Sequence, residues 1–147
     1  MVMCMKVDKK ILDLLLKNAK KAFNNGEIPV SAIIVDHNGN IVSSSCNNRQ
    51  KKSNVLGHAE INCILSAEKK LKDWRLDGCC MFVTLEPCDM CSMIINESRI
   101  SNVYYFVSKK SVVNDYNIDI NKYLVEEYPE YTDLYKSLLT SFFDNKR

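Results

Sequence analysis

The sequence predicts an α/β protein in which one mixed β-sheet is covered by helices. Three observations support this prediction. Two apolar, β-branched segments flank Asn38-Gly39, a strong signal for a β-hairpin. Two strand–helix–strand passages follow, and these imply parallel strands joined by right-handed crossovers. Apolar residues at helical spacing near both ends of the chain predict two amphipathic helices.

The first half of the chain supplies the hairpin and two helices. Asp8 is a favourable N-cap, and Gly26 is expected to end the helix that follows it. In chain order we expect a helix from Asp8 to Gly26, strands at 29–35 and 41–46, a polar loop at 47–57 and a helix at 58–70. His37 lies in the hairpin turn and is expected to be exposed to solvent.

The second half continues the alternation of strands and helices. In chain order we expect a strand at 79–85, a helix at 88–98, a strand at 102–107 and a C-terminal helix through residues 134–143. Pro87 is expected to end the strand before it and to suit the start of the next helix. Residues 108–130 have no clear period, and a fifth strand is expected at 123–125.

Size and composition favour one domain, residues 1–147, with a core of its own. Apolar residues make up 46% of the chain, and no apolar run reaches the length needed to span a bilayer. The N-terminus lacks the layout of a signal peptide. We therefore expect no membrane partner and a cytoplasmic location. The net charge of +2 gives no global basic field, so any nucleic acid must bind to local basic patches.

The seven cysteines favour reduced thiols or a metal site, because their number is odd and no secretion signal is present. Cys79 and Cys80 are adjacent on an expected strand, so their side chains should point to opposite faces of the sheet. Such a pair would chelate a metal poorly. Cys88 and Cys91 are instead three residues apart at an expected helix start, where both can share a face.

His58 completes a set of three nitrogen and sulfur ligands with Cys88 and Cys91. Three protein ligands and a fourth position open to water are typical of a catalytic Zn²⁺ site. Glu60 lies two residues from His58 and can stand beside the metal without binding it. Zinc lowers the pKa of a bound water, and a nearby carboxylate can move the released proton to a leaving group. The combined pattern H-x-E…P-C-x-x-C is the signature of zinc nucleobase deaminases.

More extended motifs resemble the bacterial tRNA-specific adenosine deaminases, which have a cytidine-deaminase-like fold. The matching segments are Glu27-Ile28-Pro29-Val30, Asn47, His58-Ala59-Glu60-Ile61, Asp73-Trp74-Arg75-Leu76, residues 83–91, Ser98-Arg99-Ile100 and residues 138–143. The zinc motif is shared by all cytidine-deaminase-like enzymes, whereas Trp-Arg-Leu and the terminal Phe-Phe are more particular to the tRNA enzymes.

The resemblance implies a three-layer α/β/α fold with a central mixed sheet of five strands, and a homodimer. It implies deamination of the wobble adenosine to inosine in a tRNA anticodon stem-loop. Asn47 would then hydrogen-bond the flipped base, and Pro29 and Val30 would line its pocket. Phe142 and Phe143 would lie by the anticodon loop, where aromatic rings can stack on splayed bases.

Three segments depart from the family pattern. Ser31 stands where the family usually has Gly, and Leu56-Gly57 stands where it usually has Thr-Ala. Residues 106–111 contain no glycine, although the family has a glycine-rich segment there that borders the substrate. The last of these departures concerns recognition of the nucleotides that flank the target base and leaves the zinc motif intact.

Three functions of different classes fit the sequence. The first is tRNA adenosine deamination, in which basic clusters at 49–52 and Lys109-Lys110 would contact phosphates. The second is deamination of a free base or nucleotide, such as guanine, cytosine or dCMP. The third is a non-catalytic zinc module, against which Glu60 argues because a structural site needs no general base. A steep loss of activity with salt would distinguish the first from the second.

Overall fold

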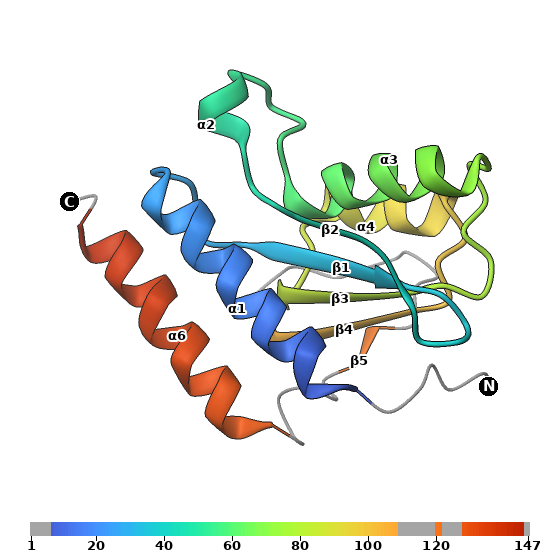
Figure 1. The fold of residues 1–147 in the computed structure, drawn as a ribbon. Coiled ribbons are helices and arrows are strands. Elements are labelled where there is room, and N and C mark those ends of the chain that lie inside the picture. The colour runs from blue at the N-terminus through green and yellow to red at the C-terminus, as the bar shows by residue number, and fades with distance from the viewer. Residues whose placement is uncertain (1–6, 109–119, 122–127, 146–147) are drawn as a thin grey trace.

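The computed structural model describes residues 7–108, 120–121 and 128–145. Its centre is a five-stranded mixed sheet in the order β2-β1-β3-β4-β5, covered by helices (Figure 1). The strands are β1 Ser31–Val35, β2 Ile41–Cys46, β3 Cys80–Leu85, β4 Asn102–Val107 and β5 Ile120–Asn121. The helices are α1 Lys9–Asn24, α2 Arg49–Lys52, α3 Ala59–Leu71, α4 Asp89–Glu97 and α6 Pro129–Asp144. The predicted α/β class is confirmed.

β1 and β2 form the predicted antiparallel hairpin. Asp36 holds the turn, because its Oδ1 accepts hydrogen bonds of 2.9 Å from the backbone N–H groups of Asn38 and Asn40. Gly39 has a φ of +82°, a conformation that glycine adopts without steric cost. His37 is exposed, as expected.

The strand order explains how two crossovers build a mixed sheet. β3 and β4 pair in parallel, as predicted for strands joined through α4. β1 lies between β2 and β3 and is antiparallel to both, so β2 and β3 run in the same direction without pairing. The fifth strand is the two-residue β5, which is parallel to β4. The strand predicted at 123–125 lies outside the described residues.

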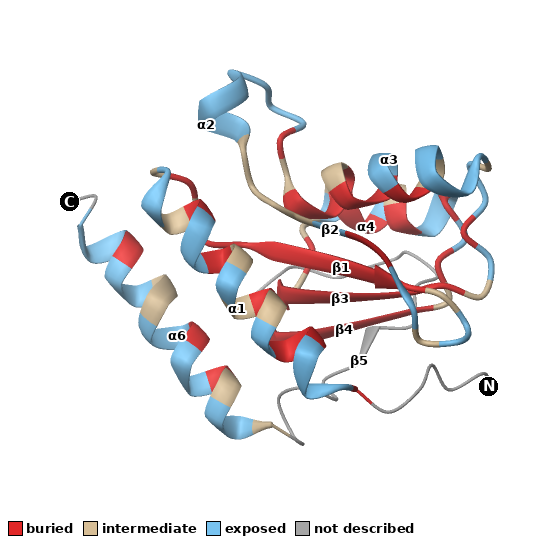
Figure 2. Ribbon diagram, viewed as in Figure 1, coloured by how far each residue is buried: buried red, intermediate tan, exposed pale blue. Residues whose placement is uncertain are grey.

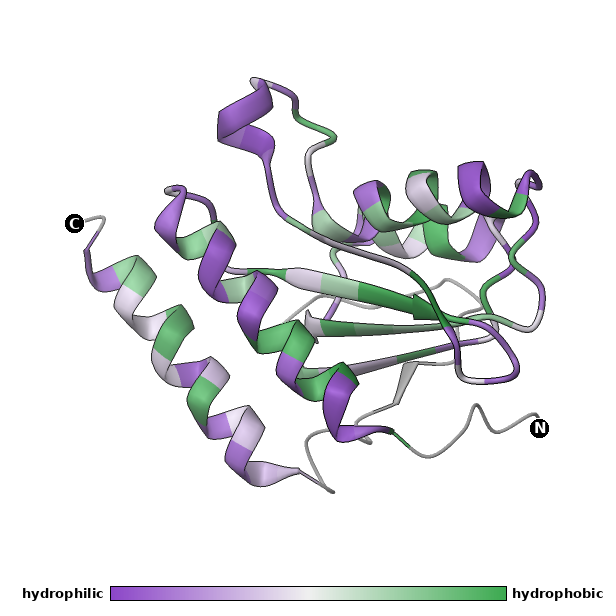
Figure 3. Cartoon of the chain, in the orientation of Figure 1, coloured by the Kyte–Doolittle hydropathy of each residue, from purple (hydrophilic) through white to green (hydrophobic). Residues whose placement is uncertain are grey.

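Helices cover both faces of the sheet, which gives the three-layer α/β/α architecture. Successive side chains of a strand point to opposite faces, and the two cores divide accordingly. Ile34 packs in the core that contains Cys63 of α3, whereas Ile33 packs in the core that contains Leu15 of α1 and Tyr135 of α6. Figure 2 shows β1, β3 and β4 and the inward faces of the helices as buried, and Figure 3 shows that the outer helix faces are mainly hydrophilic.

The two terminal helices pack side by side on one face of the sheet (Figure 1). α1 begins at the predicted N-cap, where the Asp8 carboxylate accepts a hydrogen bond of 3.0 Å from the backbone N–H of Lys10. α6 packs Leu138 and Leu139 against the core on this face of the sheet. Tyr135 and Phe142 are its buried aromatic residues, while Leu134 and Phe143 are 60% and 50% exposed.

The segment 47–57, predicted as a loop, contains the short helix α2 and returns to its starting point. The backbone N–H of Asn48 donates to the carbonyl of Gly57 at 2.9 Å. A Cβ atom at Gly57 would lie 2.6 Å from backbone atoms of Arg49, so only glycine fits this approach. The segment therefore delivers the chain to His58. In the part of the chain that the structure describes, no helix is both long enough and apolar enough to cross a membrane.

Candidate metal centre and substrate cavity

His58 occupies the N-cap position of α3 with extended backbone angles, φ −91° and ψ 143°. Its own side chain makes no capping hydrogen bond to the described residues. Instead, Oδ1 of Asn47 accepts a hydrogen bond of 2.8 Å from the backbone N–H of Ala59. Because another segment caps the helix, the His58 imidazole is left to face α4.

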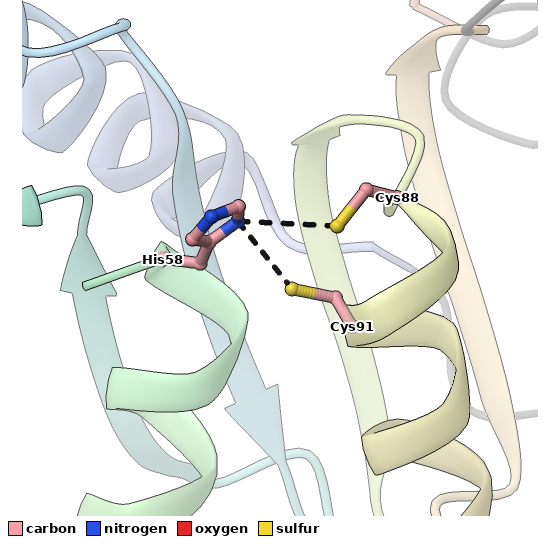
Figure 4. Close-up of side chains that lie close together, drawn as sticks. All are labelled: His58, Cys88 and Cys91. Atoms are coloured by element: carbon pink, nitrogen blue, oxygen red, sulfur yellow. Dashed lines mark hydrogen bonds between the residues drawn. The ribbon is translucent and has the colours of Figure 1, made fainter. Parts of the chain in front are cut away.

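Cys88 and Cys91 lie at the start of α4, with Cys88 as its N-cap. Figure 4 shows both sulfur atoms pointing toward the imidazole of His58. Nδ1 of His58 is 3.6 Å from Sγ of Cys91 and 4.0 Å from Sγ of Cys88. The structure thus brings together the three side chains that the sequence predicted as ligands.

The spacing of these three groups fits a zinc ion. Tetrahedral zinc sites have bonds of about 2.3 Å to sulfur and about 2.0–2.1 Å to nitrogen, which place sulfur and nitrogen about 3.6 Å apart. The two observed distances of 3.6 and 4.0 Å are close to that value. All three potential ligand atoms lie within 4.8 Å of one another. The group can therefore close around one metal ion with small side-chain adjustments.

The electrostatics of the group also call for a cation. The pKa of the Cys91 thiol is held above its usual range, chiefly by its hydrogen bond with Cys88, then by burial and by the charge of Glu60. A divalent cation reverses the balance because a coordinating thiol is deprotonated.

Glu60 is 4% exposed and lies in the first turn of α3. Its charge contributes to the raised pKa of Cys91, of Cys63 and of Tyr135, which places the carboxylate within the protein interior beside the ligand group. Among the described residues, the compact set of potential ligand atoms does not include Glu60. This is the placement that a proton carrier beside a metal requires.

A cavity of about 540 Å³ borders His58. Its walls include Asn47 and, from the C-terminal helix, Phe142 and Phe143. Three separate parts of the chain therefore meet at this cavity: the predicted metal ligand His58, and two parts that were predicted to contact substrate, at Asn47 and at Phe142-Phe143. The volume falls within the range of about 300–1,000 Å³ that is usual for ligand pockets.

Asn47 is fixed by hydrogen bonds at two points. Its backbone N–H donates to the carbonyl of Val30 at 3.0 Å, and its Oδ1 accepts from Ala59. Its Nδ2 group donates no hydrogen bond to any residue that the structure describes, so this donor remains for a ligand. The side chain of Asn47 can therefore cap α3 and contact a base at the same time.

Pro29 and Val30 are placed differently from the expectation. Both are buried, and among the described residues the walls of the cavity include neither of them. The side chain of Val30 packs in the core on the α3 side of the sheet. Their neighbours Glu27 and Ile28 line the cavity instead.

The two terminal phenylalanines differ in their surroundings. Phe142 is 8% exposed and packs edge-on against Phe23 of α1, with ring centroids 6.1 Å apart. Phe143 is 50% exposed and packs edge-on against Phe142, with ring centroids 5.4 Å apart. Phe142 thus anchors the helix end, and Phe143 presents an aromatic surface.

Glu27 has a role that sequence reasoning did not assign. It is 2% exposed, and its carboxylate accepts hydrogen bonds from the backbone N–H groups of Gln50 at 3.0 Å and Lys51 at 2.8 Å. These bonds tie the start of α2 to the wall of the cavity. The sequence shows only that an acidic residue precedes an apolar strand. It does not show that the Glu27 carboxylate bonds to backbone groups more than 20 residues away.

The remaining cysteines lie apart from the metal group. Cys79 and Cys80 pack in opposite cores, as the strand geometry predicted. In the described part of the chain, Cys46, Cys63 and Cys79 form no disulfide bond. Cys80 is disulfide-bonded, so the expectation of reduced thiols is wrong at this residue. Cys4 lies outside the described residues.

Comparison with known families places this site in a class. Residues 5–107 match the family described as the cytidine and deoxycytidylate deaminase zinc-binding region. The match includes His58, Glu60, Cys88 and Cys91. The chain belongs to this family of zinc-binding deaminases, and zinc is the cofactor that the family and the His/Cys/Cys group indicate.

Within that family, the chain is similar in sequence to tRNA-specific adenosine deaminases. The chain is 37% identical over 143 residues to the tRNA-specific adenosine deaminase of Aquifex aeolicus, a match that covers 92% of this chain and 93% of that enzyme. It is 44% identical over 94 residues to the enzyme of the same name from Rickettsia bellii, covering 63% of this chain and 65% of the relative. The resemblance inferred from the motifs is confirmed.

Solved structures agree on the fold. A structure from studies of A-to-I editing by tRNA:A34 deaminases at the wobble position of transfer RNA has a TM-score of 0.69 and 29% identity, covering 76% of this chain and 95% of that chain. The guanine deaminase of Nitrosomonas europaea has a higher TM-score of 0.79 but 16% identity, covering 95% and 86%. At that identity the likeness shows the fold alone.

Proposed function

We propose that this protein deaminates the wobble adenosine of a tRNA anticodon loop to inosine, with residues 1–147 forming one zinc-dependent domain. One observation carries the proposal. His58, one of the three residues of the His/Cys/Cys group, lines a cavity of about 540 Å³ together with Asn47, and the buried Glu60 lies two residues from His58. The match to an adenosine deaminase over 92% of the chain supports adenosine as the target.

In this proposal, Nδ1 of His58 and the sulfur atoms of Cys88 and Cys91 hold the zinc ion. When bound there, zinc lowers the pKa of a bound water toward neutrality and so supplies a nucleophile. His58 can adopt this role because Asn47 replaces it as the cap of α3. The three side chains come from the starts of α3 and α4, and both helices are anchored by buried residues such as Cys63 and Ile95.

Glu60 is the proton carrier of the proposed reaction. Its carboxylate takes a proton from the attacking water and passes it to the ring nitrogen beside C6 of adenine. A second transfer, to the amino nitrogen, lets ammonia depart while the C6 carbonyl forms. Water and adenosine are thereby converted to ammonia and inosine, and Glu60 returns to its starting state. Its burial keeps bulk water from competing for these protons.

Recognition of the base is assigned to the cavity. Asn47 offers its Nδ2 donor to an acceptor on the purine, because its Oδ1 is already engaged by Ala59. Pro29 and Val30 are proposed to act from behind this residue, since the Val30 carbonyl holds the backbone of Asn47. Phe143 provides a surface on which a base flanking the target can stack, and Phe142 holds it in place.

Contacts to the anticodon stem-loop are assigned to basic residues around the cavity. Arg49 lines the cavity itself, and Lys51 and Lys52 are exposed on the same short helix α2. Such residues neutralise phosphates, which gives the complex its affinity and makes it sensitive to salt. The second basic cluster proposed from the sequence, Lys109-Lys110, lies outside the described residues. A tRNA substrate also implies a location in the cytoplasm.

We further propose that the protein is a homodimer that uses the outer face of α3 and α4. Three large apolar side chains are exposed there: Leu65 at 60%, Trp74 at 53% and Met93 at 50%. Leu65 and Trp74 border a shallow hollow of about 180 Å³ whose floor is apolar. Exposed apolar surface of this kind marks interaction sites, and a second copy of the chain is the occupant that the family resemblance supports.

The proposed substrate class is tested with an anticodon stem-loop carrying a wobble adenosine, compared with free adenosine, adenine, guanine, cytosine and dCMP. We expect efficient deamination of the stem-loop alone, with activity that falls steeply as salt rises. The reason is that binding energy from phosphates and stacked neighbours can be used to position the target base. Comparable turnover of a free base, without salt dependence, would instead establish a free-base deaminase.

A further inference from the structure

Two further hollows lie beside the cavity, along α1 and α2. A second hollow, of about 270 Å³, shares Asn25, Glu27 and Asn47 with the cavity. A third, of about 930 Å³, shares Asn25, Lys21 and Lys51 with the second. Because they share lining residues, the three hollows lie next to one another between His58 and the exposed face of α1. We call the second and third hollows together the α1 groove.

Lysine dominates the charge of the α1 groove. Its basic residues are Lys17, Lys20 and Lys21 of α1 and Lys51 and Lys52 of α2. All five are exposed. Among the described residues, the single ion pair joins Asp73 and Arg75. No lysine of the α1 groove therefore forms an ion pair with a carboxylate of the described residues.

The two acidic residues of the groove are already engaged. The Glu27 carboxylate accepts two backbone hydrogen bonds from the start of α2. Oδ1 of Asp13, at the far end of the groove, accepts a hydrogen bond of 2.8 Å from the hydroxyl of Tyr131. A local excess of positive charge therefore remains, in a chain whose net charge is only +2.

The arrangement on α1 is not explained by the stability of the helix. Lys17, Lys20 and Lys21 lie at spacings of three and four residues, so their charges share one face and repel one another. Lys21 alone lies in the last turn, where the helix dipole favours a cation. A row of cations that leads toward a catalytic cavity is what a polyanionic strand would require.

We propose that the α1 groove binds the sugar–phosphate backbone of the RNA strand that flanks the deaminated nucleotide. The proposal rests on the proposed function and extends the RNA contact from α2 to α1. The lysines neutralise successive phosphates, and the amides of Asn18 and Asn25, which line the groove, offer donors to phosphate or ribose oxygens. The target base enters the cavity at the end of the groove where Asn25 and Asn47 line both the groove and the cavity.

The test compares two triple variants that remove the same charge. Lys17→Gln/Lys20→Gln/Lys21→Gln changes the groove, and Lys69→Gln/Lys70→Gln/Lys72→Gln changes exposed lysines at the opposite end of α3 from His58. Glutamine keeps the helix propensity of lysine. Affinity for a fluorescent anticodon stem-loop is measured by anisotropy from about 50 to about 200 mM salt, the range over which phosphate contacts dominate. Zinc content and melting temperature are measured on the same samples.

The groove variant should bind at least about tenfold more weakly at low salt. The slope of log affinity against log salt should flatten by about 2, or about 0.7 for each of three phosphates lost. The control variant should keep the wild-type slope. Equal losses in both variants, or an unchanged slope in the groove variant, would overturn the proposal. The double variant Lys17→Gln/Lys20→Gln keeps Lys21, the cation in the last turn of α1, and so controls for helix stability. It should show a smaller loss of RNA affinity and a smaller change of the salt slope than the triple variant.

The binding measurement also separates this proposal from the proposed function. A wild-type protein that binds the stem-loop with groove-dependent affinity but does not deaminate it would refute the proposed function and support the groove. A wild-type protein that deaminates the stem-loop with no contribution from the groove lysines would do the reverse.

Discussion

The backbone N–H of Ala59 donates a hydrogen bond of 2.8 Å to Oδ1 of Asn47. This bond joins the two functions of the site. It caps α3 at the residue after His58, which leaves the imidazole to face Cys88 and Cys91. It also fixes the Asn47 amide with its Nδ2 donor available in the cavity wall. One residue thus holds both the metal ligand and the predicted contact to the base.

Two substitutions of Asn47 separate these functions. Asn47→Asp keeps an oxygen that can cap α3, so stability should be retained, but it loses the Nδ2 donor. We expect kcat/KM for the stem-loop to fall roughly 5- to 150-fold, equivalent to about 1–3 kcal/mol for one unmade hydrogen bond. Asn47→Ala should lose the same activity and also about 1 kcal/mol of unfolding free energy. Denaturant melts and steady-state kinetics measure the two effects.

The outcomes for the two Asn47 variants are independent. Wild-type kinetics in Asn47→Asp would show that Nδ2 does not contact the substrate. Wild-type stability in Asn47→Ala would show that the hydrogen bond to Ala59 does not support the helix.

Replacing a predicted zinc ligand should remove the metal. Purified wild-type protein should contain about one zinc per chain, and Cys88→Ser should contain almost none. The variant should also melt earlier, because zinc at 100 times its Kd adds about 2.7 kcal/mol to the folded state. Cys46→Ser is the matched control, since Cys46 lies outside the ligand group. Full zinc content in Cys88→Ser, measured by elemental analysis, would contradict the ligand assignment.

The phenylalanine pair should separate binding from stability. Phe143→Ala removes an exposed ring and should raise KM for the stem-loop about 5- to 100-fold, the range expected for one stacked base at about 1–3 kcal/mol. Its melting temperature should stay near the wild-type value. Phe142→Ala removes a ring that packs on Phe23 and should lower the unfolding free energy by about 3 kcal/mol. If Phe143→Ala is destabilised and its KM is unchanged, the ring of Phe143 supports the fold and does not contact the RNA.

The proposed dimer face can be tested with a charge on either of two equally exposed leucines. Leu65 of α3 and Leu134 of α6 are both 60% exposed. Leu65→Glu would bury a charge in the proposed interface and should yield a monomer in sedimentation analysis, because an unpaired buried charge is costly. Leu134→Glu should remain a dimer. Loss of the dimer in Leu134→Glu alone would move the interface to α6.

Local sequence signals were sufficient for the elements that depend on local physics. Asp8, Gly39 and Pro87 each marked a boundary that the structure contains, because caps and turns are decided by a few neighbouring residues. The pairing of β1 between β2 and β3 was not predictable in this way, since strand order depends on long-range packing. The burial of Tyr135 in α6 was not predicted either, because it depends on contacts with Phe106 of a distant strand.

The metal group was predictable because its residue types and spacing are chemically restrictive. The surroundings of the site were not. Glu27 acts through backbone groups of α2, and Ser31 ties the sheet to α1 by donating to the carbonyl of Leu15 at 2.6 Å. Such bonds join positions far apart in sequence and leave no periodic signal. The absence of Pro29 and Val30 from the described cavity walls likewise depends on long-range packing, which places Val30 in the core.

Glu60 is the proposed proton carrier in the deamination of a wobble adenosine beside the His/Cys/Cys metal group. The most direct measurement is the inosine content at the wobble position of an anticodon stem-loop, determined by nucleoside mass spectrometry for wild type and Glu60→Gln. Wild type should convert the wobble adenosine, while Glu60→Gln should retain its zinc and bind RNA but turn over about 10²–10⁴-fold more slowly. Near-normal conversion by Glu60→Gln, or no inosine from zinc-loaded wild type, would contradict the account.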